Sequence, residues 1–149
     1  MKKGINNILL IQLLFLSLAL ITAVQKITGT FVPEWFIKKF EKTLIGTVPY
    51  GIEISYLIII VLESLIAICF LISLIRLEFV SGRSKSFLFW GFDLAMLLFL
   101  ILFFGSFLAG DYSNGALDFM YFGITYLFKR DLEKRFCSLI HLKKSEKLN

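Results

Sequence analysis

The chain has 149 residues, of which 58% are hydrophobic and 17 are phenylalanine, and its mean hydropathy is +0.82. A soluble domain is typically about 45–50% apolar, and a chain this short cannot bury such an excess in a water-soluble core. The composition therefore excludes an ordinary soluble domain and predicts an integral membrane protein. The net charge of +5 comes from basic residues beside apolar runs, so it does not indicate nucleic-acid binding.

Four apolar segments are predicted to cross a bilayer as helices, because none shows the period of two that is typical of barrel strands. They cover residues 8–27, 54–75, 87–109 and 112–128. The sequence thus predicts an all-α fold, an integral membrane four-helix bundle that forms one domain over residues 1–149. Ser17-Leu18-Ala19 also resembles a signal-peptide cleavage site, but the apolar run continues through Val24, which favours an uncleaved helix.

The first outer loop, between the first two spans, is predicted to hold an amphipathic helix over residues 33–45. Its apolar side chains recur at helical spacing and share one face. They are Phe36, Ile37, Phe40 and Leu44. Pro33 suits the first helical turn and Gly46 suits the position after the last one. We expect this helix to lie in the interface, where it either closes the loop or forms a lid over a cavity.

The positions of the basic residues predict the orientation of the spans. With the N-terminus inside, twelve of the sixteen Lys and Arg fall in inner segments, including the basic tail over residues 129–149. The turn between the last two spans, residues 110–115, carries no cation and has the Gly, Asp, Ser and Asn typical of a hairpin. We therefore expect a multi-pass protein of a cell membrane, the bacterial inner membrane, with both termini in the cytoplasm.

Charged residues inside the predicted spans are the candidate functional residues, because each costs several kcal/mol unless it is paired or neutralised. At a rise of about 1.5 Å per residue, Lys26, Glu63 and Asp118 fall in the outer half of the bundle, where we expect them to meet. Tyr56 and Tyr121 add hydroxyl donors nearby. This cluster either holds the helices together or forms a polar pocket that receives a proton from a quinol or binds a polar headgroup.

Asp93 is expected near the inner face, where its predicted partner is a cation of the second loop. The candidates are Arg76, Arg83 and Lys85.

The sequence shows no catalytic motif and no metal-ligand spacing. The sole histidine, His141, lies outside the predicted spans, so haem ligation by two histidines of this chain is excluded. Cys69 and Cys137 form no CxxC motif, and we expect neither a structural disulfide nor a dithiol centre. Catalytic residues therefore stay unassigned, and no metal is expected.

Several features occur in the order that is seen in a known family. A lysine, Lys26, closes the first helix, an amphipathic loop with Trp35 follows, then Pro49, and then a second helix with Glu63 at its centre. In these features the chain resembles the DoxX-like membrane proteins, including the MauE branch, most clearly over residues 8–76. The resemblance implies a four-helix membrane protein. Some members are associated with respiratory quinone reduction or with redox maturation of partner proteins.

Two functions follow as hypotheses. The first is a non-enzymatic accessory or lipid-interacting component of the membrane, with the lipid bilayer as its partner and a membrane protein or a second copy of the chain as a further one. The second is a quinone- or redox-linked subunit that uses the polar site of Lys26, Glu63 and Asp118. In the second case quinone is the cofactor, and the electrons or thiols come from a partner.

Overall fold

The computed structural model describes residues 2–29, 32–80 and 83–146, and within these ranges it is helical and contains no strand. The side chains of residues 7–29, 32–80 and 83–136 are described as well. This confirms the predicted all-α class for the described part of the chain. The helices are α1 (Lys2–Thr28), α2 (Glu34–Phe40), α3 (Leu44–Thr47), α4 (Gly51–Ile75), α5 (Ser86–Leu108) and α6 (Tyr112–Glu146).

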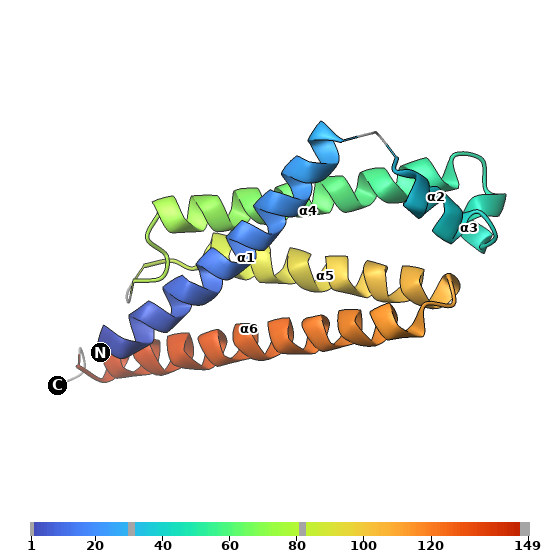
Figure 1. Ribbon diagram of the computed structural model, residues 1–149. Coiled ribbons are helices and arrows are strands. Elements are labelled where there is room, and N and C mark those ends of the chain that lie inside the picture. Colours follow the sequence, from blue (N-terminus) through green and yellow to red (C-terminus); the bar gives the residue numbers. More distant parts are fainter. Residues whose placement is uncertain (1, 30–31, 81–82, 147–149) are drawn as a thin grey trace.

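The four long helices pack in chain order. α1 packs against α4, α4 against α5, and α5 against α6. Figure 1 shows α4, α5 and α6 side by side, with α1 crossing them obliquely. The start of α1, the end of α6 and the α4–α5 connection lie at one end of the molecule, on the left of Figure 1. The opposite end carries α2, α3 and the α5–α6 turn, and we call it the α2 end.

Within the described residues, three helices are long and apolar enough to cross a membrane by length and composition. They are Asn7–Thr28 of α1, Gly51–Ile75 of α4 and Ser86–Leu108 of α5. The predicted fourth span, residues 112–128, forms the first part of α6, which continues without a break into the basic tail. This stretch is shorter than the roughly 20 residues that a span needs, and Asn114 and Asp118 interrupt it.

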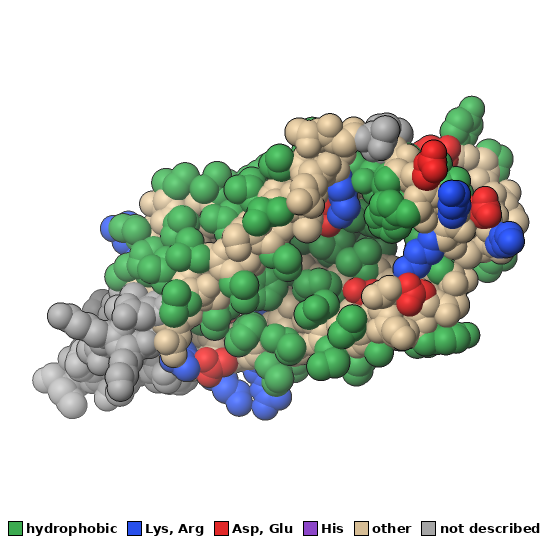
Figure 2. Space-filling view, in the orientation of Figure 1, with side chains coloured by type: hydrophobic (Ala, Val, Ile, Leu, Met, Phe, Trp, Pro, Cys, Tyr) green, Lys and Arg blue, Asp and Glu red, His purple; other side chains and the backbone are tan. Residues whose placement is uncertain are grey.

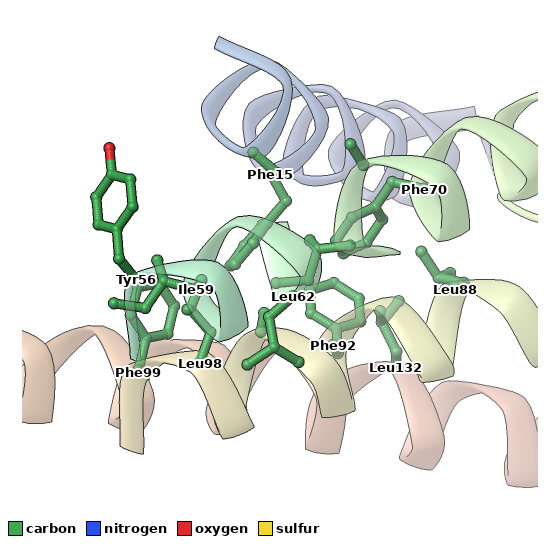
Figure 3. Close-up of a cluster of buried hydrophobic side chains, with 14 of the residues drawn as sticks. Phe15, Tyr56, Ile59, Leu62, Phe70, Leu88, Phe92, Leu98, Phe99 and Leu132 are labelled. Atoms are coloured by element: carbon green, nitrogen blue, oxygen red, sulfur yellow. The ribbon is translucent and has the colours of Figure 1, made fainter. Parts of the chain in front are cut away.

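The core is built from aliphatic and aromatic side chains, most of which come from α1, α4 and α5. The Phe92 ring lies edge-on to the rings of Phe15 and Phe70, with centroids 5.3 and 5.2 Å apart. Figure 3 shows these side chains meeting between the three helices. Gly91 allows α5 to approach α4 here, because a Cβ at this position would lie 3.0 Å from the Phe70 ring. Gln12 of α1 adds a polar contact by donating a hydrogen bond to the Phe70 carbonyl oxygen at 3.0 Å.

The outward surfaces of the long helices are apolar. Large hydrophobic side chains are exposed on all four, and Figure 2 shows such side chains spread over the face it presents. Examples are Leu10, Leu14, Ile54, Ile75, Trp90, Phe104, Phe119 and Leu127. Contiguous apolar surface of this kind marks a contact with lipid or with another protein.

The predicted helix over residues 33–45 is divided in the structure into α2 and α3. The division occurs at Thr43, which has an extended backbone (φ −99°, ψ 172°) and whose hydroxyl donates to the Phe40 carbonyl oxygen at 2.8 Å. The chain folds back so tightly that a Cβ at Gly46 would lie 2.4 Å from the Glu41 carbonyl oxygen. Of the predicted apolar face, only Phe36 and Phe40 are buried.

Candidate functional site

Lys26 and Glu63 meet inside the molecule. Lys26 lies in the last turn of α1 and Glu63 lies near the middle of α4, and the lysine Nζ donates to Glu63 Oε1. The side chains are 22% and 7% exposed, respectively. The second oxygen, Glu63 Oε2, is buried and has no hydrogen-bond partner among the described residues. The pair therefore neutralises its own charge but leaves one acceptor unsatisfied.

The oblique crossing of α1 over α4 explains how these two residues come together. Because α1 crosses α4 rather than running alongside it, the end of α1 reaches the middle of α4 (Figure 1). Tyr56 occupies the same helix as Glu63, two turns nearer the α2 end, and is 3% exposed. Its ring packs edge-on against Phe36, with centroids 5.0 Å apart, so Tyr56 connects α4 to α2.

Asp118 forms no hydrogen bond or ion pair with Lys26 or Glu63, although the three were expected to meet. It accepts a hydrogen bond from the Ser106 hydroxyl of α5 at 3.0 Å. The reason is the order of packing: α6 packs against α5, whereas α1 packs against α4. The Lys26–Glu63 pair and the Asp118–Ser106 contact are therefore separate polar sites.

Tyr121 contributes to neither the Lys26–Glu63 pair nor the Asp118–Ser106 contact. Its side chain is on α6 and is half exposed, and its ring packs against Phe99 of α5 with centroids 5.6 Å apart. We predicted Tyr121 near the cluster from its depth along the span alone. Its side chain points from α6 toward α5 and contacts Phe99 instead.

Asp93 pairs with Lys129 of α6, with 2.5 Å between Lys129 Nζ and Asp93 Oδ1. The prediction of a partner from the α4–α5 connection is therefore wrong. None of the three candidates pairs with it: Arg76, Arg83 and Lys85. Arg76 instead lies over a phenylalanine ring of α5, 4.7 Å from its centroid. Because α6 continues past residue 128 as one helix, Lys129 remains beside α5 and reaches Asp93.

A cavity of about 520 Å³ opens at the α2 end between α2, α4, α5 and α6. Most of its wall is apolar, and it includes Phe36 and Phe40 of α2, which face side chains of α4 and α5. Polar groups also line it: Lys39, Ser55, Ser106, Asn114 and Asp118. Figure 2 shows charged side chains gathered at this end of the molecule, beside a gap in the surface.

The charges around this cavity are not balanced. Lys39 Nζ lies 2.7 Å from Asp111 Oδ2, in the turn before α6, so these two charges compensate each other. Hydrogen bonds from Lys39 and from Asn114 hold the pKa of the Asp111 carboxyl at about 2, below its ordinary 3.8. Asp118 has no ion-pair partner among the described residues, and Ser106 is its one hydrogen-bond donor there. The cavity therefore has largely apolar walls and one carboxylate, Asp118, that has no ion-pair partner among the described residues.

Sequence reasoning missed three residues that line the cavity with Asp118: Lys39, Ser106 and Asn114. Lys39 lies outside the apolar face that was expected for the interfacial helix. Ser106 falls within the span predicted over residues 87–109, and Asn114 falls within the turn expected over residues 110–115. The useful signal was the hairpin around Gly110, because residues on either side of a tight turn between antiparallel helices face each other. Ser106 and Asp118 are such a pair.

The described residues contain no group of three or more His, Cys, Asp and Glu side chains that could hold a metal ion. Cys69 is a free thiol. The side chains of Cys137 and His141, and residues 147–149 of the predicted tail, lie outside the described residues.

The site cannot be assigned by similarity. Comparisons of the chain with models of protein families, with curated proteins and with solved structures found no match.

Proposed function

We propose that this chain is an integral membrane protein of the DoxX-like type, in which the first part of α6 provides a fourth crossing beside α1, α4 and α5. The three span-length helices and the apolar outward surfaces support this proposal. The excess of Lys and Arg at the end opposite α2 supports an orientation with both termini in the cytoplasm of a bacterium. The α2 end then faces outward.

The protein acts, in this proposal, as a non-enzymatic component that binds an amphipathic ligand from the bilayer. The observation that carries this is the cavity at the α2 end, which combines apolar walls with a few polar groups. Its volume of about 520 Å³ falls within the roughly 300–1,000 Å³ of known ligand pockets. An amphiphile fits such a cavity because its chain lies against the apolar wall while its headgroup meets the polar groups.

Native mass spectrometry of the protein purified in a mild detergent tests this function. We expect one amphiphile to remain bound at a stoichiometric ratio, and organic extraction then identifies its class. Narrowing the cavity with Ile59→Trp should reduce the bound fraction, whereas Ile75→Trp, at an exposed position far from the cavity, should not. A protein that carries no amphiphile under any mild extraction condition contradicts the proposal.

The orientation is tested separately by labelling single cysteines in a background that lacks Cys69 and Cys137. A cysteine at Ser113, next to the α5–α6 turn, should react with a reagent that cannot cross the membrane when the reagent is added outside intact cells. Labelling of this position only after the cells are opened would place the α2 end inside, and the topology proposed here would be wrong.

The alternative function is a quinone- or redox-linked subunit that uses the Lys26–Glu63 pair. The observation in its favour is the buried Glu63 Oε2, which has no partner among the described residues and is available to accept a proton. Oxidation of a quinol releases two electrons and two protons, so a partner protein must take the electrons. Stoichiometric quinone in the purified protein, lost in a Glu63→Gln variant and retained in the cavity variant Ile59→Trp, would favour this function over the first.

A further inference from the structure

The charged groups at the cavity at the α2 end leave one negative charge without a counter-ion, which favours a cationic ligand. Two of its lining residues are charged, Lys39 and Asp118. Lys39 is already paired with Asp111 at 2.7 Å, which leaves Asp118 as the charge without a counter-ion among the described residues. A carboxylate beside apolar surface is costly unless a cation or a proton neutralises it. A ligand that brings a positive charge therefore gains more here than a neutral or negative one.

We infer that the ligand of this cavity is an amphiphile with an ammonium headgroup, and that Asp118 is the counter-ion of this headgroup. The inference rests on the proposed amphiphile-binding function and names the class of ligand. Ser106 positions the carboxylate by donating to Asp118 Oδ2, which leaves Asp118 Oδ1 free to accept from the ammonium group. An anionic headgroup would instead meet the negative charge of Asp118 and a lysine that is already engaged.

Aromatic rings add to the attraction for a cation. Trp35, Phe36 and Phe40 of α2 line the cavity, and aromatic faces attract ammonium groups through their quadrupole. The Phe40 ring lies over Gly105, where a Cβ would be 3.5 Å from it, and Gly105 directly precedes the Ser106 that holds Asp118. An aromatic ring is thus adjacent to the carboxylate site.

The size and lining of the cavity favour an amphiphile over a small free amine. An ammonium group occupies only a small part of about 520 Å³, and the remaining wall is largely apolar. Ile58, Ile59, Ile101 and Leu102 offer surface for an alkyl chain. The chain of an amphiphile fills this apolar space, which a free amine leaves empty.

The inference is tested with three probes that have the same bromoundecyl chain and differ only in headgroup: an amine, an alcohol and a carboxylate. Bromine quenches tryptophan fluorescence on contact, and Trp35 lines the cavity. A Trp90→Phe background leaves Trp35 as the single reporter, because the chain has two tryptophans. We expect the amine to quench Trp35 saturably. The mole fraction of amine in the micelle that gives half of the maximal quenching should be about tenfold lower than that of the alcohol, because one charge-assisted hydrogen bond contributes a factor of this size.

Asp118→Asn keeps an oxygen that accepts from Ser106 but removes the charge. It should weaken binding of the amine about tenfold and leave the alcohol unchanged. Glu53→Gln is the matched control, because Glu53 is an exposed carboxylate near the same end and does not line the cavity. This control should change the binding of neither probe. It removes one negative charge, as Asp118→Asn does, and so separates the effect of the Asp118 contact from the effect of a change in net charge. Circular dichroism and thermal unfolding of each variant confirm that the fold is retained.

The outcomes separate this inference from the function on which it rests. Equal quenching by the amine and the alcohol, or an amine curve that Asp118→Asn does not change, would overturn the ammonium headgroup but keep an amphiphile site. Saturable quenching by none of the probes would overturn both. Butylamine, which has the headgroup without the chain, should fail to compete with the bromoundecylamine at the same concentration. Competition at equal strength would identify a free amine as the ligand and contradict the inference.

Discussion

Replacement of Lys26 by methionine should strongly destabilise the protein, because it leaves the Glu63 carboxylate buried without its cation. The Glu63 side chain is only 7% exposed, and Lys26 is its ion-pair partner. Removing one partner of a buried ion pair costs about 3–5 kcal/mol. We expect Lys26→Met to fall in this range, since methionine fills a similar volume and the main change is the loss of charge.

The opposite replacement should cost less. Glu63→Gln leaves Lys26, whose side chain is 22% exposed and sits at the end of α1, so its amino group can move toward the surface. We expect a loss of about 1–2 kcal/mol, the cost of weakening one hydrogen bond of a charged group. In the double variant neither charge is stranded, so its loss should be about 2–4 kcal/mol smaller than the sum of the two single losses.

The measurement is a double-mutant cycle on unfolding in mixed micelles, with the same denaturing detergent series for all four proteins. Lys38→Met is the matched control, because Lys38 is 74% exposed and lies 3.7 Å from Glu34 in a surface pair. Its loss should stay below about 0.5 kcal/mol. If the loss of unfolding free energy in the double variant equals the sum of the two single losses, then the unpaired Glu63 carboxylate is not the cause of the Lys26→Met loss. That result would refute the reasoning from burial.

Two further predictions concern packing and pH. Gly91→Ala should destabilise by about 1–3 kcal/mol in the same unfolding assay, because the new methyl group meets the fully buried Phe70 ring at 3.0 Å, whereas Gly123→Ala, with no atom within 4 Å, should stabilise by about 0.5–1 kcal/mol. The pKa of Asp111 is lowered to about 2, chiefly by its hydrogen bond from Lys39, so its stabilising effect is complete above pH 3.8 and is lost as the pH falls toward 2. Asp111→Asn should therefore flatten the fall of the melting temperature in that window, and an unchanged slope would show that the carboxylate plays no part in it.

The depth of a charge in the sequence predicted one contact well. Lys26 and Glu63 are both charges of apolar helices, and a rise of about 1.5 Å per residue places both in the outer half of the bundle. A nearby opposite charge favours the charged form of a buried carboxylate. The structure brings the two together, and the length of the lysine side chain helps it to reach Glu63 from the end of α1.

Depth alone did not predict the surroundings of Asp118. Height along a bundle axis says nothing about which helices are neighbours, and α6 packs against α5 rather than α1. The same limit applies to Asp93, whose partner Lys129 was assigned to a separate tail although α6 runs through it as one helix. The direction in which a side chain points and the choice of neighbouring helices depend on tertiary packing, and the hydropathy of the sequence predicts neither.

The division of α2 from α3 was missed for a different reason. The apolar spacing of Phe36, Phe40 and Leu44 fits a single helix, and this spacing outweighed the local preference of Thr43 to cap a new one. In the structure Thr43 directly precedes α3, its hydroxyl donates to the Phe40 carbonyl oxygen instead of capping α3, and Leu44 is exposed. The division also shapes the cavity, because α2 ends at Phe40 and its Phe36 and Phe40 rings lie against α4 and α5.

The Lys26–Glu63 pair and the Asp118–Ser106 contact suit different roles, because the first is electrically neutral and the second carries an unpaired carboxylate among the described residues. Lys26 and Glu63 neutralise each other, so a ligand that displaced either would have to replace the bond it breaks. This favours the pair as a link between α1 and α4. Asp118 has a hydrogen bond from Ser106 but no cation among the described residues, so an arriving ammonium group has no ion pair to break there. The same desolvation cost favours the first site as a structural link and, in our proposal, the second as a binding site, and Asp118→Asn tests that difference directly.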